Sequence, residues 1–418
     1  MTGSARLAVN GDRIMSRIGK LAEFTEPDRP YTRRAFSDEY VRARDWLGAE
    51  FRAAGLEVSV DAGANLVGSR AGRSGQDRTI MLGSHIDTVP GGGRFDGIAG
   101  VVTALEVAQV LHENGVELAH RLSIVDFLSE EPSDFGAACI GSRALVGNLS
   151  SAMLDQQDQN GERLAAAIGR MGGDPLRLAW PLLTPGQVRA YLELHIEQGP
   201  VLEASGQPLG LVEGIVGIGR CKITVRGQAG HAGTTPMSMR ADALVGAARF
   251  VDLAATAAGD LATQLPFVAT VGQLNVLPNG SNVVPGRVDL VLEARSLDDG
   301  VTREFLEQIT SAGRQVCQEL GLGFDATPES FAPAVKCDAG LRAMLAEACD
   351  ARGHAYGELI SGAGHDAMEL AAIAPTALVF VPCDDGLSHH PEENARQAEL
   401  VAGTEVMLDT VIQLDRSE

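Results

Sequence analysis

Basic residues are scarce in this chain. Its 418 residues include 34 Lys and Arg against 55 Asp and Glu, which gives a formal net charge of −21. A surface this acidic repels phosphate backbones and anionic lipid headgroups. The charge balance therefore disfavours both nucleic acid and a membrane as partners.

Long apolar runs and paired cysteines are also missing. No apolar stretch approaches the roughly 20 residues of a membrane-spanning helix. Residues 1–6 lack the basic start and apolar run of a signal peptide. The six cysteines are scattered without a Cys-x-x-Cys pair, a pattern typical of reduced, buried thiols rather than of a disulfide framework. We expect a cytoplasmic protein.

Aromatic residues make up only 4% of the chain, so we expect cores built mainly from aliphatic side chains. Hydrophobic residues account for 45% and charged residues for 21%, which is typical of globular proteins. A chain of this length exceeds what one core usually supports, and this predicts two domains.

Short apolar runs alternate with helical patterns in the first and last parts of the chain. Strands are expected at residues 79–82, 122–128, 191–196 and 377–381, because each run is nearly continuous, as in strands covered on both faces. Between the first two runs, apolar residues recur at helical spacing over residues 98–111. This alternation predicts an α/β fold, a mostly parallel sheet with helices on both faces.

Residues 212–329 follow a different pattern. Strand and helix signals come in the order β-α-β-β-α-β, with a turn-forming stretch at residues 278–282 between the two central strands. This order is typical of a small ferredoxin-like α+β domain. Because α/β character returns afterwards, we predict that residues 212–329 are inserted into a larger domain formed by residues 1–211 and 330–418.

Residues with metal-ligand chemistry gather in five short segments. Four of the segments directly follow a predicted strand or occupy the end of one. The remaining segment, which contains Asp96, lies on the glycine-rich loop that follows the first segment. In open α/β sheets, ligands bind outside the carboxyl ends of the strands, so the five segments could converge on one crevice. A single histidine there is usually structural, but the joint occurrence favours a metal site. The segments are residues 83–90, 93–97, 129–132, 193–200 and 386–391.

The charge and reach of these side chains suggest their roles. Asp96 is the candidate for a carboxylate that bridges two cations and neutralises their repulsion. His85 and Glu131 could hold one cation, and His195 and His389 the other, but spacing leaves this pairing open. Imidazole and carboxylate ligands suit zinc, manganese, cobalt or nickel.

Two further carboxylates are candidates for support and for proton transfer. Asp87 lies two residues after His85 and on the same side of an extended strand end. Its carboxylate could therefore accept the second imidazole N–H and orient the ring. Glu130 and Glu131 are adjacent and their side chains diverge, so one can bind metal while the other stays free beside the bound water. We assign the free carboxylate, the general base, to Glu130.

Together these motifs resemble the di-zinc amidase and carbamoylase family. Its members include N-carbamoyl-L-amino-acid hydrolases, allantoate amidohydrolases and β-ureidopropionases, within the superfamily of aminoacylases and glutamate carboxypeptidases. The resemblance runs from about residue 31 to residue 390. It implies Glu130 as general base and Asp96 as the bridging ligand, and it fixes the order within the glutamate pair, which spacing could not. The implied metal ligands are His85, Asp96, Glu131, His195 and His389.

Other residues match substrate-side positions of the same family. His231, in a Gly-His-Ala-Gly segment, is implied to reach the active site of the partner subunit and to polarise the scissile carbonyl. Asn282 and Arg295 match binders of the substrate carboxylate, to which a guanidinium fork is well suited. Gln198 and Gly364 match further substrate-side positions. Without the resemblance, each of these would be an ordinary loop, turn or strand residue.

The resemblance also implies cofactors, assembly and activity. It implies two divalent metal ions per subunit, zinc foremost with manganese, cobalt or nickel as alternatives, and a homodimer whose insertion serves as lid and dimerisation domain. We predict a hydrolase of the carbamoyl or ureido C–N bond in N-carbamoyl-L-amino acids, allantoate or β-ureidopropionate, with a water between the metal ions as nucleophile. The alternatives are a dipeptidase or aminoacylase of the same superfamily and a non-catalytic metal-binding protein.

One position departs from the family pattern. The final motif reads Ser388-His389-His390-Pro391, whereas many relatives carry Asn or another residue at the position of His390. The match places the ligand on His389. Ligation by His390, in addition or instead, stays open at this point.

Overall fold

The computed structural model describes residues 6–73 and 76–417, so most of the segment examined for a signal peptide lies outside the described residues. The chain divides into two compact units, Met1–Glu213 with Cys337–Glu418, and Gly214–Lys336. The second border falls beyond residue 329, because the strand that begins at Gly323 runs on to Ala332 and a further short strand follows it.

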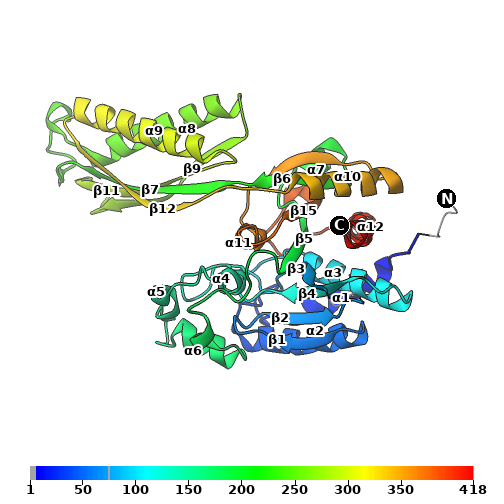
Figure 1. Ribbon diagram of the computed structural model, residues 1–418. Coiled ribbons are helices and arrows are strands. Elements are labelled where there is room, and N and C mark those ends of the chain that lie inside the picture. Colours follow the sequence, from blue (N-terminus) through cyan, green and yellow to red (C-terminus); the bar gives the residue numbers. More distant parts are fainter. Residues whose placement is uncertain (1–5, 74–75, 418) are drawn as a thin grey trace. The chain divides into compact units, whose positions relative to one another are not determined.

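The first unit is built on a nine-stranded sheet (Figure 1), whose short strand β13 belongs to the last residues of the second unit. The strands are β1 (Glu57–Val60), β2 (Leu66–Arg70), β3 (Gln76–Ser84), β4 (His120–Asp126), β5 (Val188–Ile196), β6 (Gly210–Ile215), β13 (Val335–Lys336), β14 (Gly357–Ser361) and β15 (Thr376–Val381). Their order is β1-β2-β4-β3-β5-β15-β6-β13, with β14 paired to β6. The chain passes between the two units through β6 and β13.

The four central strands, β4, β3, β5 and β15, are parallel. This confirms the predicted α/β architecture around a parallel sheet. The outer pairs β1–β2, β2–β4 and β15–β6 are antiparallel, which the apolar runs did not predict. Because the central strands share one direction, their carboxyl ends meet at one edge of the sheet, and the loops that leave this edge can bring distant residues together.

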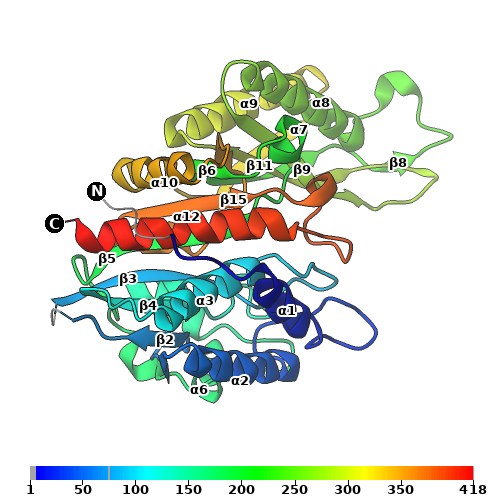
Figure 2. The ribbon, with the colours of Figure 1, turned by 90° about the vertical axis from the view of Figure 1, so that its right-hand side faces the viewer.

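Helices cover both faces of this sheet (Figures 1 and 2). On one face α1 (Gly11–Ala22), α3 (Ile98–Glu113) and α12 (Gln397–Arg416) pack against one another, and on the other lie α4 (Ile140–Val146) and α11 (Ala367–Leu370). Every residue of α3 from Ile98 to Leu111 is buried, because this helix lies between the sheet and two other helices. The remaining helices of the unit are α2 (Asp38–Ala53), α5 (Ser151–Leu154), α6 (Leu164–Arg170), α7 (Val201–Ser205) and α10 (Ala339–Arg352).

The second unit has a four-stranded antiparallel sheet with two helices on one face. Its main elements are β7 (Gly217–Arg226), α8 (Ala243–Ala262), β9 (Phe267–Leu277), β11 (Arg287–Ser296), α9 (Asp299–Glu319) and β12 (Gly323–Ala332). The strand order is β12-β7-β11-β9, and β8 (Gly230–His231) pairs with β10 (Val283–Val284) in a separate ribbon. Buried and half-buried residues alternate along β11, as expected for a sheet with one covered face.

The helices of the second unit begin at acidic caps. The Asp242 carboxylate accepts the N–H groups of Leu244 and Val245 at the start of α8, and Asp298 does the same for two residues at the start of α9. Side-chain caps of this kind satisfy N–H groups that have no partner within the helix. Among the described residues, no helix is both long enough and apolar enough to cross a lipid bilayer.

Candidate metal centre

The carboxyl end of β3 leads directly to His85 and Asp87. The buried His85 ring has its Nδ1 atom 3.0 Å from the backbone carbonyl oxygen of Asp87. A carbonyl can only accept, so Nδ1 carries a proton, and Nε2 is the ring nitrogen that can bind a cation. The Asp87 carboxylate lies farther from the ring, at 3.5 Å, and accepts the N–H groups of Glu130 and Glu131 at 3.3 and 3.2 Å. Asp87 therefore orients the ring mainly through its backbone, and its carboxylate fixes the glutamate pair.

His195 occupies the end of the neighbouring strand β5. Its Nδ1 lies 2.9 Å from the carbonyl oxygen of Ile196, so this ring also carries its proton on Nδ1. Its Nε2 accepts the backbone N–H of Gly97 at 3.1 Å and lies 3.3 Å from Asp96 Oδ1. Because β3 and β5 are adjacent, the centroids of the His85 and His195 rings are only 6.0 Å apart.

Asp96 lies at the centre of the cluster, on the loop before α3. Its Oδ1 is 4.0 Å from His85 Nε2, and its Oδ2 is 3.1 Å from His389 Nε2. The next residue, Gly97, has a φ of 68°, and a Cβ at this position would stand 2.3 Å from His85 Nε2. Only glycine allows the loop to approach the ring so closely.

The loop after β15 brings His389 to the other side of Asp96. His389 Nε2 lies 3.2 Å from Glu131 Oε1. The neighbouring His390 is exposed, and its Nδ1 accepts the backbone N–H of Glu392 at 3.2 Å. Of the two adjacent histidines, the structure therefore brings His389 to the cluster.

The ligand-type atoms form two groups that share Asp96. In each group, one atom from every residue lies within 4.8 Å of the others. The groups are His85 with Asp96 and His195, and Asp96 with Glu131 and His389. This differs from the pairing suggested by the sequence, in which His85 accompanied Glu131. The reason is the strand order, which sets the end of β3 beside the end of β5.

Glu130 belongs to neither of these groups. Its Oε2 lies 3.6 Å from His85 Nε2, and its Oε1 accepts the thiol of Cys139 at 3.7 Å. Burial raises the pKa of the Glu130 carboxyl well above its ordinary value. A carboxylate that adjoins a ligand cluster without belonging to it is a candidate for proton transfer.

Glu393 is a residue of this site that the sequence did not reveal. Its Oε1 accepts the backbone N–H groups of Phe95 and Asp96 at 2.8 and 3.0 Å, and its Oε2 accepts the hydroxyl of Ser388 at 3.1 Å. Burial raises the pKa of this carboxyl to about 7. Glu393 thus anchors the loop that carries Asp96. Its exposed neighbour Glu392 looks identical in sequence, so no local signal distinguishes the two.

Glu193, which begins the segment 193–200, and His365 were given no individual role by the sequence. Together with His195 they form a third buried group of ligand-type atoms. The Glu193 carboxylate accepts the hydroxyls of Ser84 and Tyr191, each at 2.8 Å, and the His365 ring stands edge-on to His195 with centroids 4.6 Å apart. Burial lowers the pKa of His365 well below its ordinary value. The spacing of Glu193, two residues before His195 on a strand, could have indicated it.

Gln198 and Gly364, the substrate-side candidates of the first unit, both lie near this cluster. Gln198 Nε2 donates to Asp96 Oδ2 at 3.1 Å and to the Ser388 hydroxyl at 3.3 Å. Its Oε1 is buried without a hydrogen-bond partner among the described residues. Gly364 lies in the loop between β14 and α11, directly before His365.

His231, Asn282 and Arg295 lie in the second unit. The ribbon of β8 and β10 joins the first two, and the N–H of Ala232 donates to the carbonyl of Asn282 at 2.9 Å. Arg295 lies near the end of β11, where its Nε donates to Glu293 at 2.7 Å. Eight residues of strand separate Arg295 from the start of β11, a length of about 26 Å. The structure therefore brings His231 and Asn282 together at the ribbon that precedes β11 in the chain, and it places Arg295 near the far end of that strand.

The fold and the two ligand groups define the class as an α/β protein with a candidate divalent-metal centre at the carboxyl ends of its parallel strands. Residues 81–413 match the family model described as peptidase family M20/M25/M40. The chain belongs to this family and is a hydrolase.

Individual relatives extend this match to nearly the whole chain. An N-carbamoyl-L-amino acid amidohydrolase from Geobacillus stearothermophilus is 38% identical over 411 residues, which cover 98% of this chain and 100% of the relative. An allantoate deiminase from Arabidopsis thaliana is 33% identical, over 93% of this chain and 79% of the relative. The crystal structure of a hydantoinase/carbamoylase family amidase from Burkholderia multivorans superposes with a TM-score of 0.90 at 34% identity, over 98% and 99% of the two chains. The family resemblance is thus confirmed.

Proposed function

We propose that this chain hydrolyses the carbamoyl or ureido C–N bond of N-carbamoyl-L-amino acids or of related ureido acids such as allantoate and β-ureidopropionate. The observation that carries the proposal is the arrangement around Asp96, in which two ligand groups share one carboxylate and Glu130 stays outside both. The names of the relatives, an N-carbamoyl-L-amino acid amidohydrolase and an allantoate deiminase, support this substrate class.

We propose that each subunit binds two divalent cations, one in each ligand group. The donor set fits, because each group offers three imidazole or carboxylate ligands, and the Nδ1 atoms of His85 and His195 face backbone carbonyls, which leaves Nε2 of each ring to bind a cation. These donors suit zinc first, and also manganese, cobalt or nickel. Bound there, the cations would polarise a carbonyl and lower the pKa of a water molecule toward neutrality.

The side chains of the protein move the proton and hold the substrate. The Glu130 carboxylate accepts a proton from the attacking water and passes it to the leaving nitrogen. Gln198 Oε1, which is buried without a partner among the described residues, is an acceptor available to a ureido N–H. The products are the free amine, ammonia and carbon dioxide.

We further propose that the active protein is a homodimer in which two chains complete each site. In one chain, His231 and Asn282 lie at the ribbon that precedes β11, and Arg295 lies about 26 Å along β11 from the first residue of that strand. A ureido acid is much shorter, so one copy of the second unit cannot place all three on one substrate. In our proposal, one chain supplies Arg295 to bind the substrate carboxylate, and its partner supplies the equivalents of His231 and Asn282.

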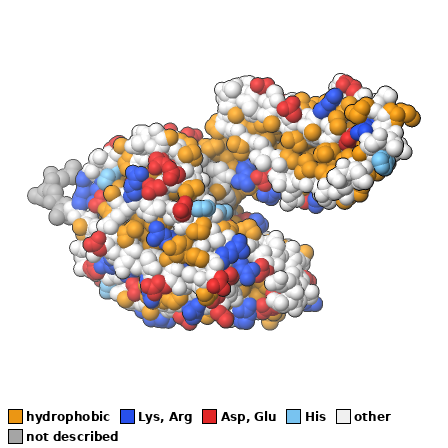
Figure 3. All heavy atoms as spheres, turned by 180° about the vertical axis from the view of Figure 1, so that it is seen from behind, with side chains coloured by type: hydrophobic (Ala, Val, Ile, Leu, Met, Phe, Trp, Pro, Cys, Tyr) orange, Lys and Arg blue, Asp and Glu red, His pale blue; other side chains and the backbone are white. Residues whose placement is uncertain are grey.

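The surface of the second unit supports this assembly. Its strand β9 is the edge of the sheet, and unpaired edges are ready to pair with another chain. Figure 3 shows hydrophobic side chains gathered on the side of this unit that carries α8 and β9, and Leu244, Val245, Val268, Leu274 and Leu277 are exposed there. Apolar patches of this kind mark association surfaces.

A kinetic panel tests the proposed function. The protein loaded with zinc, manganese or cobalt is assayed against N-carbamoyl-L-amino acids, allantoate, β-ureidopropionate, dipeptides and N-acetyl amino acids. Turnover of the first three classes supports the proposal. Turnover of only dipeptides or N-acetyl amino acids would replace it with a dipeptidase or an aminoacylase. No turnover by protein that holds two cations would favour the non-catalytic alternative.

Replacing Arg295 should affect substrate binding more than catalysis. We expect Arg295→Gln to raise KM by about ten- to a hundredfold with a smaller change in kcat, because a fork that binds the carboxylate is lost. The KM of Arg295→Lys should lie between those of the wild type and Arg295→Gln, since lysine keeps the charge but lacks the guanidinium fork. Arg287→Gln, at the other end of the same strand, is the matched control. Equal KM values for Arg295→Gln and the control would show that Arg295 does not bind substrate.

Replacing Glu393 should weaken metal binding. We expect Glu393→Ala to lower the affinity for zinc by about ten- to a hundredfold, because the Asp96 loop loses its anchor, whereas Glu393→Gln keeps an oxygen that can accept the same two N–H groups. Competition with a chromophoric chelator measures the affinity without reference to activity. Glu392→Ala is the exposed control. An unchanged affinity in Glu393→Ala would limit Glu393 to a role in folding.

A further inference from the structure

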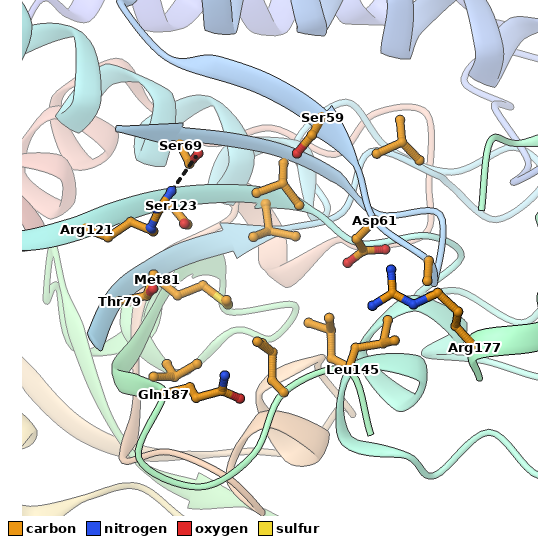
Figure 4. A pocket seen from close by; sticks show the side chains of 17 residues that line it. Ser59, Asp61, Ser69, Thr79, Met81, Arg121, Ser123, Leu145, Arg177 and Gln187 are labelled. Carbon is orange, nitrogen blue, oxygen red and sulfur yellow. Dashed lines mark hydrogen bonds between the residues drawn. The ribbon is translucent and has the colours of Figure 1, made fainter. Parts of the chain in front are cut away.

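A cavity separate from the ligand cluster lies within the first unit (Figure 4). Its volume is about 450 Å³, within the range of small-molecule sites. Its lining comes from the strands β1 to β5 and from residues 145–188, which pack on the sheet face opposite α3. None of the proposed metal ligands or substrate residues lines it.

The floor of the cavity is one face of the sheet. Alternate residues of a strand face the same side, so residues from three strands stand in rows. Ser69 of β2 is paired with Ser123 of β4, which is paired in turn with Met81 of β3. In the next row, Arg121 of β4 is paired with Thr79 of β3. Met81 and Ser123 are buried, so the floor combines an apolar surface with hydroxyl groups.

Apolar side chains form the walls. The N–H groups of Leu182 and Leu183 both donate to the carbonyl of Leu145 at 2.9 Å, which fixes one wall to the end of α4. Val125 and Val188 are 1% exposed and complete the apolar lining. Native packing leaves few voids larger than a water molecule, so an open space of this size with a fixed wall is a feature to be explained.

The charges at the cavity are arranged unevenly. Figure 4 shows Arg177 on the side of Asp61 and Arg121 on the opposite side. Arg121 Nη1 donates to the Ser69 hydroxyl at 3.4 Å, and no carboxylate of the described residues forms an ion pair with it. Arg121 therefore offers an uncompensated positive charge beside an apolar floor, in a chain whose net charge is −21.

We propose that this cavity binds a small amphipathic carboxylic acid. The carboxylate binds to the Arg121 guanidinium and the Ser69 hydroxyl, and the apolar body of the ligand lies against Met81, Val125 and Val188. A neutral ligand would leave the guanidinium without a counter-charge, and an ammonium would be repelled by it. The proposal does not depend on the catalytic function, because it concerns a separate site and is tested by binding alone.

The test uses hexanoate as probe and hexan-1-ol as its neutral counterpart, each titrated into the full-length protein and followed by saturation-transfer NMR. We expect hexanoate to bind saturably and hexan-1-ol to bind more weakly. Arg121→Gln should weaken hexanoate binding about tenfold, because the charged hydrogen bond is lost, and should leave hexan-1-ol unchanged. Arg52→Gln, an exposed arginine on α2, is the matched control. A second variant, Ser123→Leu, fills the floor and should weaken both probes.

The possible outcomes are distinct. Absence of saturable hexanoate binding to the wild-type protein would overturn the proposal. Equal hexanoate affinity in the wild type, Arg121→Gln and Ser123→Leu would place the binding elsewhere and would overturn it as well. Arg121 is exposed, so we expect Arg121→Gln to fold normally. Its hexanoate affinity therefore decides the test even if Ser123→Leu proves unstable in thermal unfolding.

Discussion

Glu130→Gln is expected to lower kcat by about 10²- to 10⁴-fold and to leave the metal content unchanged. Glutamine keeps the size and hydrogen-bonding shape of the side chain but cannot accept the proton of the attacking water. The Glu130 carboxylate lies outside both ligand groups, so its loss should not release a cation. The measurement is kcat on the best substrate of the panel, with bound metal counted by mass spectrometry after dialysis.

The adjacent residue provides the matched control. Glu131→Gln removes a member of the second ligand group, so bound metal should fall together with activity. The two variants change neighbouring residues whose backbone N–H groups donate to the same Asp87 carboxylate, and only their metal content should differ. Wild-type kcat in Glu130→Gln would assign the proton transfer to another group. A loss of metal equal to that in Glu131→Gln would make Glu130 a ligand instead.

Much of this site could be predicted because its residues lie at strand ends. Residues 191–196, read as a buried strand from their apolar run, are entirely buried in β5. Such runs identify strands covered on both faces, and the carboxyl ends of parallel strands meet at one edge. This rule places the segments of His85, Glu131, His195 and His389 at one edge of the sheet, where the adjacency of β4, β3, β5 and β15 lets them meet.

The pairing of the ligands depends on information that local patterns do not contain. The strand order β4-β3-β5-β15 decides that His85 stands beside His195. An apolar run in the sequence predicts a strand but does not indicate which strands lie next to it in the sheet. Glu393 shows the same limit, since tertiary contacts alone distinguish it from Glu392. Both features arise from contacts between segments far apart in the chain, which periodicity cannot reveal.

The position of Arg295 illustrates how structure sharpens a resemblance. Sequence similarity implied that His231, Asn282 and Arg295 all face substrate and that His231 reaches the partner's site, but it did not say from which chain Asn282 and Arg295 come. Arg295 lies about 26 Å along β11 from the first residue of that strand, whereas His231 and Asn282 lie at the ribbon that precedes the strand in the chain. The resemblance thereby becomes a geometric condition on the proposed assembly. The proposed sharing of sites between chains can be tested with heterodimers, in which each active site is either functional or nearly inactive.

A heterodimer of one His231→Ala chain and one Glu130→Gln chain should recover about half of the wild-type activity, although each variant homodimer is nearly inactive. If His231 acts on the partner's site, the site of the His231→Ala chain receives an intact histidine from its partner and retains its own Glu130. The other site carries both lesions. Purification through two different affinity tags isolates the heterodimer, and kcat per dimer is the measurement.

The reciprocal heterodimer gives the opposite outcome and serves as the control. When a wild-type chain is paired with a Glu130→Gln/His231→Ala chain, each site carries one lesion if His231 acts across the dimer, so activity should be nearly absent. If His231 acts within its own chain, this heterodimer would keep one intact site and about half of the wild-type activity, while the first would be inactive. The two measurements together therefore decide whether His231 serves its own site or that of its partner.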